Sequence, residues 1–219
     1  MSEEKIELVH KHSLWLRWLH WIHFPVLMLM ILSGLQIYWA NDIYTRSFLD
    51  RKLFNYLGLD HKLADGMYLH FTLAWILVAN AILYIGYLLA SGEWRELLPE
   101  PRSFRQAIVV LLHDLGLSKN LPPQGKFNAA QRIAYTSVLF IGFIAIVSGI
   151  AIYKPVQLLW LTRLFFGYEG ARLIHFGSML SLLGFFCIHL AQVIRSGWNN
   201  FQAMITGFEV KNEPKNKSQ

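Results

Sequence analysis

Four long apolar segments constrain this chain more than any other feature. They lie near residues 14–40, 66–90, 130–153 and 171–196. Each is longer than the ~18 residues that mark a helix able to cross a bilayer. The chain is 54% hydrophobic and 16% charged, an apolar balance that is unusual for a soluble domain. The sequence therefore predicts an all-α membrane protein, a bundle of four transmembrane helices.

The connections between these segments predict additional helices in the membrane interface. The stretch SFRQAIVVLLHDLGL, residues 103–117, has the periodicity of an amphipathic helix. The stretch PVQLLWLTRLFFG, residues 155–167, predicts a short outer interfacial helix that ends at Gly167. A weaker helical pattern covers residues 45–56.

Lysine and arginine counts predict the orientation of the spans. If the N-terminus is cytoplasmic, the segments on that side carry thirteen Lys and Arg, against seven in the outer loops. Because positive residues concentrate in cytoplasmic segments, both termini are expected to be cytoplasmic. The predicted organisation is a cytoplasmic segment at 1–13, a four-helix transmembrane domain at 14–198 and a cytoplasmic tail at 199–219. After Gly207 this tail is charged and is expected to be disordered.

Charge and cysteine content exclude other classes. The formal net charge of +6 arises from basic residues in loops and tails, which suits anionic lipid better than nucleic acid. Cys187 is the only cysteine and lies inside a span, so neither a disulfide framework nor a thiolate metal cluster is expected. The first apolar run is too long for a signal peptide, and no small-residue cleavage site follows it.

The fourth apolar segment carries two histidines, His175 and His189, fourteen residues apart. On a helix they lie within about 40° of one another and about 21 Å apart along the axis. An imidazole inside a membrane is costly and usually has a function. Two such residues on one face suit two haems stacked across the bilayer, each iron taking one ligand from this helix. The alternative is two unrelated histidines that form hydrogen bonds with neighbouring helices.

The other segments supply a second histidine at each depth. With the N-terminus inside, His20 and His189 lie near the cytoplasmic surface, and His70 and His175 lie near the outer surface. The pairs His20–His189 and His70–His175 would each give bis-imidazole iron with no open position. Gly34, fourteen residues after His20, shares its helix face and lets a flat group approach at the outer level. Ordinary small-residue helix packing is an equal alternative for Gly34.

Further residues are candidates around these levels. Tyr84 lies fourteen residues after His70, at the depth of the inner haem. Asn80, on the same segment, is expected to form a helix–helix hydrogen bond.

Zinc requires ligands that converge on one point, so four histidines divided between two levels do not suit a shared zinc site. Basic residues near the two levels are candidates to neutralise haem propionates, namely Arg17 and Arg195 inside, and Lys154 and Arg172 outside.

The motifs resemble those of a known family. RWLHW at 17–21, the Ser-Gly pair at 33–34 and RLIHF at 172–176 look like the four-helix di-haem cytochrome b proteins. These include the cytochrome b subunit of nickel–iron hydrogenase, the formate dehydrogenase gamma subunit and the bacterial cytochrome b561 group. The run at 148–176 looks closest to the thiosulfate-reductase-type cytochrome b subunit.

The resemblance implies two haem b groups ligated by His20, His70, His175 and His189 in a bacterial inner membrane protein. It also implies electron exchange between membrane quinone and an extracytoplasmic oxidoreductase of the molybdenum or hydrogenase type. The chain has no iron–sulfur, flavin or nucleotide motif, so substrate chemistry would lie on a partner and no catalytic residue is assigned. The sequence leaves two alternative functions open: a stand-alone cytochrome b561-like quinone oxidoreductase, and a haem-free membrane anchor.

Overall fold

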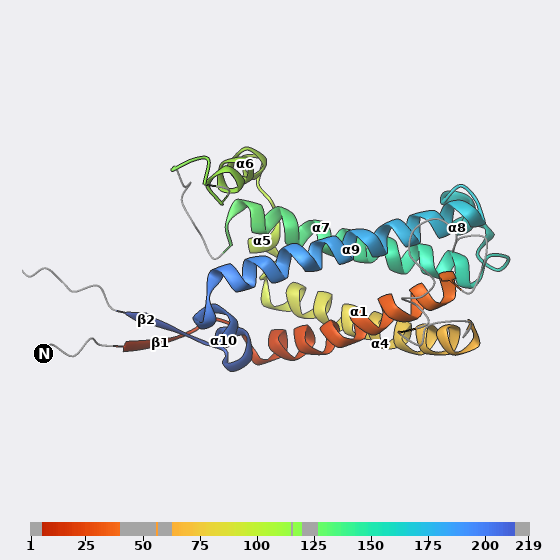
Figure 1. The fold of residues 1–219 in the computed structure, drawn as a ribbon, viewed down its shortest axis with the longest axis horizontal. Coiled ribbons are helices and arrows are strands. Elements are labelled where there is room, and N and C mark those ends of the chain that lie inside the picture. The colour runs from red at the N-terminus through yellow and green to blue at the C-terminus, as the bar shows by residue number, and fades with distance from the viewer. Residues whose placement is uncertain (1–5, 40–55, 57–62, 115, 120–126, 213–219) are drawn as a thin grey trace, which may run out of the picture. The chain divides into compact units, whose positions relative to one another are not determined.

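Four long helices form most of the computed structural model, which describes residues 6–39, 56, 63–114, 116–119 and 127–212 (Figure 1). Each corresponds to one predicted apolar segment, with ends that differ by only a few residues. Each is also long and apolar enough to cross a membrane. The predicted all-α membrane fold is therefore confirmed. The four helices are α1 (Leu14–Trp39), α4 (Leu63–Ser91), α7 (Ala129–Tyr153) and α9 (Tyr168–Ser196).

The chain divides into two compact units. The first comprises residues 1–87 and 198–219, and the second comprises residues 88–197. The first contains α1 and most of α4, and the second contains α7 and α9. The predicted helix at 45–56 lies, apart from Tyr56, outside the described residues.

In the first unit, polar contacts join α1 and α4. The Asn80 side chain is 5% exposed, and its Nδ2 donates to the carbonyl oxygen of Leu19 at 3.2 Å. The same Nδ2 lies 3.3 Å from His23 Nδ1. The Ser13 hydroxyl, which caps the start of α1, donates to the Tyr87 hydroxyl at 2.7 Å. The predicted helix–helix hydrogen bond of Asn80 is thus confirmed.

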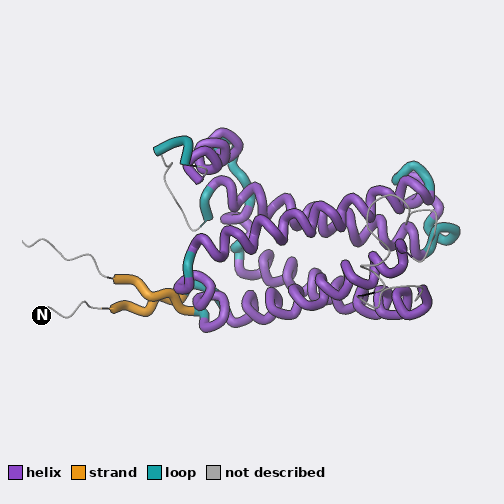
Figure 2. Tube along the Cα trace, in the orientation of Figure 1, coloured by secondary structure: helices purple, strands orange, loops and turns teal. Residues whose placement is uncertain are grey.

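The two ends of the described chain form a β-ribbon, which the sequence did not predict. β1 (Ile6–His10) pairs antiparallel with β2 (Phe208–Asn212), with His10 opposite Phe208. Figure 2 shows the two paired strands of this ribbon in orange. The expectation of disorder immediately after Gly207 is therefore wrong as far as Asn212. The ribbon forms because β2 pairs with residues 198 to 206 positions earlier in the chain, which no local pattern reveals.

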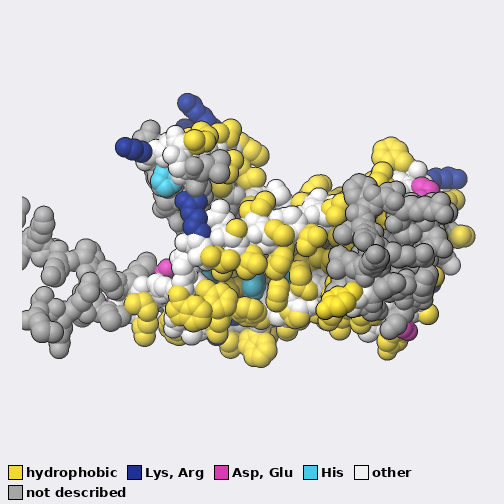
Figure 3. Space-filling model, in the orientation of Figure 1, with side chains coloured by type: hydrophobic (Ala, Val, Ile, Leu, Met, Phe, Trp, Pro, Cys, Tyr) yellow, Lys and Arg dark blue, Asp and Glu magenta, His cyan; other side chains and the backbone are white. Residues whose placement is uncertain are grey.

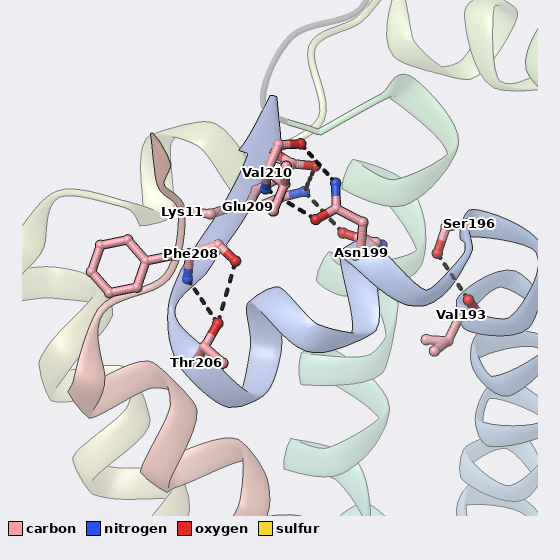
Figure 4. Close-up of polar contacts among 9 residues, drawn as sticks. Lys11, Val193, Ser196, Asn199, Thr206, Phe208, Glu209 and Val210 are labelled. Atoms are coloured by element: carbon pink, nitrogen blue, oxygen red, sulfur yellow. Dashed lines mark hydrogen bonds and ion pairs between the residues drawn. The ribbon is translucent and has the colours of Figure 1, made fainter. Parts of the chain in front are cut away.

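Side-chain hydrogen bonds hold the ribbon against α10 (Trp198–Thr206). Asn199 bonds both backbone groups of Val210, donating from Nδ2 at 2.9 Å and accepting at Oδ1 at 3.0 Å (Figure 4). Lys11 donates to Glu209 and to Asn200, each at 2.9 Å. β1, β2 and the residue that follows β1 thus form one polar assembly with α10.

The second unit packs α7 against α9, with three shorter helices around them. α7 begins with a capping box in which Asn128 and Gln131 bond reciprocally. A small apolar core lies at the other end of α7, formed by Ala151, Leu161, Phe165 and Ala171. The shorter helices are α5 (Trp94–Leu97), α6 (Ser103–Asp114) and α8 (Leu159–Leu164). The predicted helices at 103–117 and 155–167 are thus confirmed, each in a shorter form.

Exposed apolar side chains cover the long helices and one side of α6. Figure 3 shows hydrophobic side chains across the visible face, with Lys and Arg around α6. In α6, Val110 is buried while Phe104, Ile108 and Leu111 are exposed. Among the spans, Trp75 and Leu173 are each 72% exposed. Apolar surface of this extent suits contact with lipid rather than with water.

Candidate functional site

His70 lies in a close-fitting cradle on α1, within the first unit. Its Nδ1 lies 3.2 Å from the carbonyl oxygen of Met30 and 3.0 Å from the Ser33 hydroxyl. The Ser33 hydroxyl itself donates to the Met30 carbonyl at 3.1 Å. A methyl group added at Gly34 would lie 3.2 Å from His70 Cε1. Gly34 thus leaves room for the His70 imidazole, and its role toward a haem stays a prediction.

His175 lies in the same kind of cradle on α7, within the second unit. Its Nδ1 lies 2.9 Å from the carbonyl oxygen of Ala145 and 3.3 Å from the Ser148 hydroxyl. Ser148 is fully buried, and its hydroxyl donates to the Ile144 carbonyl at 2.6 Å. A methyl group at Gly149 would lie 3.1 Å from His175 Cε1.

The hydrogen bonds determine which nitrogen of each ring carries the proton. A backbone carbonyl only accepts, and each serine hydroxyl proton is already directed at a carbonyl. The proton therefore sits on Nδ1 of both His70 and His175, and Nε2 retains its lone pair. This is the arrangement of a histidine that ligates a metal through Nε2 while a second group orients the ring.

The two cradles repeat in sequence as well as in space. The motif Ser-Gly-x-x-Ile-Tyr occurs at 33–38 and again at 148–153. Ser33 and Ser148 are each the twentieth residue of their helix, and His70 and His175 are each the eighth. Both serines were missed as partners of His70 and His175 in the sequence analysis, although this internal repeat was a signal that could have identified them.

The other two candidate histidines have different surroundings. His189 on α9 stacks on Phe185, with ring centroids 5.8 Å apart and an interplanar angle of 11°. The ring of His20 on α1 packs edge-on against Trp21, with ring centroids 5.3 Å apart. In the register of the repeat, His189 corresponds to Tyr84 on α4, and His20 corresponds to Tyr135 on α7. The histidine at the eighth helix position is thus present in both units, whereas His20 and His189 each correspond to a tyrosine in the other unit.

The candidate propionate cations have protein partners of their own. Arg17 donates from Nη2 to the Ile205 carbonyl, at the end of α10. Arg172 pairs with Glu169 at 3.1 Å, one turn earlier in α9. Lys154 caps α7 and lies 4.8 Å from the Tyr153 ring centroid. Arg195 lies in the last turn of α9. These contacts place the cations near the helix ends, and their role toward a haem stays a prediction.

The donor set suits haem better than a bare metal ion. Within the described residues, no group of three or more His, Cys, Asp or Glu side chains converges on one point. Single imidazoles that offer Nε2 as an iron ligand suit a planar group whose own nitrogens supply the remaining ligands. Gly34 and Gly149 leave room for the His70 and His175 rings in this arrangement. The residues therefore fit a b-type haem.

The comparison with known families decides the class. The family model for prokaryotic cytochrome b561 matches residues 11–207, nearly the whole described chain. This chain belongs to the prokaryotic cytochrome b561 family. It is accordingly a multi-pass membrane protein that binds haem b and transfers electrons, so the alternative of a haem-free anchor is set aside.

One relative of this cytochrome b561 protein is a candidate protein-methionine-sulfoxide reductase subunit, YedZ1, of Azospira oryzae. It is 30% identical over 188 residues, which cover 85% of this chain and 91% of the relative. The family resemblance predicted from the histidine motifs is thus confirmed. The closer resemblance to a thiosulfate-reductase-type subunit stays a prediction.

Proposed function

We propose that this cytochrome b561 protein holds two b haems in series and passes electrons between membrane quinone and an extracytoplasmic oxidoreductase. Residues 14–198 would form the di-haem domain, and residues 1–13 and 199–219 would lie in the cytoplasm of a bacterial cell. The β1–β2 pairing supports this organisation, because an even number of spans brings both chain ends to the same side.

One observation carries the two-haem proposal: each of the four candidate histidines lies near one end of its helix, which would give two depths in a membrane. His70 and His175 are each the eighth residue of a helix, so both lie near the same end of their spans. His189 follows His175 by fourteen residues, about 21 Å deeper along α9. His20 is the seventh residue of α1. In the proposed orientation α1 begins on the cytoplasmic side, so His20 would lie near the cytoplasmic end.

In this proposal His20 pairs with His189, and His70 pairs with His175. A haem with two imidazole ligands supplies one-electron chemistry and has no open position for oxygen. The protein's contribution would be to hold the His70 and His175 imidazoles by Nδ1–H, to keep Nε2 of each as the iron ligand, and to exclude water with apolar helix faces. Arg17, Lys154, Arg172 and Arg195 would meet the propionates, and Tyr84 would lie near the quinone at the inner level.

The partner is inferred from what the chain lacks and from its relative. The sequence has no iron–sulfur, flavin or nucleotide motif. The Azospira oryzae relative is named as a reductase subunit, which supports a partner that carries the substrate chemistry. We expect that partner to be a molybdenum or hydrogenase type of oxidoreductase on the outer side of the membrane.

The haem content of histidine variants tests the two-haem proposal. His70→Ala and His175→Ala should each lose about half of the haem, because each iron has its own ligand pair. His10→Ala, an exposed residue in β1, is the control and should keep the full content. Haem is measured per chain by the pyridine haemochrome assay. Two haems per chain in either variant would show that the outer ligands are assigned wrongly.

The partner is tested separately with the purified chain. Quinol should reduce the cytochrome, as measured by its absorption, but oxidation by a small substrate should require a second protein containing molybdenum or nickel. Fast turnover of the purified chain alone would favour the stand-alone quinone oxidoreductase.

A further inference from the structure

We propose that Ser33–Gly34 and Ser148–Gly149 are matched positioning sites that orient His70 and His175 as ligands of the outer haem. This inference rests on the proposed function, since it takes these histidines to be iron ligands. It adds four residues to the site that act through the imidazoles.

The Nδ1 atom of each ring lies close to two oxygen atoms, and the two oxygens are of the same kind in both units. In each unit the carbonyl three residues before the serine and the serine oxygen both lie within 3.3 Å of Nδ1. One acceptor alone would let the ring swing about its hydrogen bond. Two acceptors on one helix turn restrict that motion and favour one ring orientation.

Gly34 and Gly149 leave space that the His70 and His175 rings occupy. A methyl group would lie 3.2 Å from His70 Cε1 at Gly34 and 3.1 Å from His175 Cε1 at Gly149. Such contacts are tighter than ordinary van der Waals contact, so an alanine would push the ring by a few tenths of an ångström. By contrast, a methyl group at Gly142 on α7 or at Gly86 on α4 would meet nothing within 4 Å.

The hydrogen bond at Nδ1 also affects how strongly Nε2 binds iron. A hydrogen bond from Nδ1–H to a carbonyl raises the basicity of Nε2, which makes the imidazole a stronger donor to ferric iron. Weakening that bond should raise the midpoint potential of the iron that the imidazole ligates. Because neither cradle includes His20 or His189, the inner haem should keep its potential.

The test uses the full chain purified with its haems. The variants are Gly34→Ala, Gly149→Ala, Ser33→Ala and Ser148→Ala, and the controls are Gly86→Ala and Gly142→Ala. Redox titration of the absorption bands and electron paramagnetic resonance of the ferric protein report each haem separately. In the four variants we expect one component to shift to higher potential or to be lost, while the other component and both controls stay unchanged.

Two results would overturn this inference. In the first, Gly34→Ala and Gly149→Ala match the controls in potential and resonance spectrum. In the second, both haems shift together, which would indicate general loosening of the helices. The serine variants keep the inference testable if an alanine at either glycine prevents folding. The histidine variants separate this failure from that of the proposed function, because His70→Ala and His175→Ala would still lose half of the haem if only the cradle inference were wrong.

Discussion

Asn80 on α4 donates a hydrogen bond from Nδ2 to the backbone carbonyl oxygen of Leu19 on α1, at 3.2 Å. The contact joins two of the long helices, and the Asn80 side chain is 5% exposed. Leu19 immediately precedes His20. The amide therefore ties α4 to the turn of α1 that carries the proposed inner ligand.

Replacing Asn80 with leucine should weaken this tie. Hydrogen bonds between membrane helices contribute about 0.5–2 kcal/mol, so we expect a modest loss of stability. The measurement is the temperature at which the haem absorption is lost in detergent. Thr72→Val is the matched control, because Thr72 is exposed on α4 and bonds only within its own helix. Equal melting temperatures for both variants would show that the Asn80 contact is not stabilising.

Gly170→Ala should be far more damaging than other glycine substitutions in α9. A methyl group at Gly170 would overlap the carbonyl oxygen of Phe165, which links α8 to the start of α9. Forced overpacking of this kind costs about 1–3 kcal/mol. Gly177→Ala and Gly184→Ala are controls on the same helix, where a methyl group meets nothing within 4 Å. The yield of haem-loaded protein in membranes should fall for Gly170→Ala only.

Asn199→Ala should release the β-ribbon without changing haem content. The substitution removes two hydrogen bonds to the Val210 backbone, each contributing about 1 kcal/mol. We expect faster cleavage at β2 by a protease added to purified protein, measured by mass spectrometry. Gln202→Ala, on the same face of α10, is the control and should cleave at the original rate. A loss of haem in Asn199→Ala would contradict the assignment of the ribbon to a structural role.

The proposed orientation predicts which loops are accessible from outside the cell. In a Cys187→Ser background, Val156→Cys should react with a membrane-impermeant maleimide in intact cells. Leu117→Cys should react only after the membrane is disrupted. Both side chains are well exposed, at 81% for Val156 and 74% for Leu117, so accessibility depends on the side of the membrane. The reverse labelling pattern would invert the orientation and exchange the inner and outer levels.

The sequence by itself determined the four apolar helices and the helix that the structure shows at Ser103–Asp114, and it predicts two depths for the four histidines. These follow from local physics: apolar length decides whether a helix crosses the bilayer, and a rise of about 1.5 Å per residue sets the depth of each side chain. The family followed from the same histidine motifs, and the match over residues 11–207 confirms it.

Only the tertiary structure decided which groups hold His70 and His175, and that β1 pairs with β2. The Met30 carbonyl lies forty residues from His70 in sequence, and its distance from Nδ1 depends on how α1 and α4 pack. Asn212 likewise becomes part of a strand only because Ile6 lies opposite it. Hydrogen bonds between distant segments depend on where the folded backbone places each donor and acceptor, and no local periodicity encodes that placement.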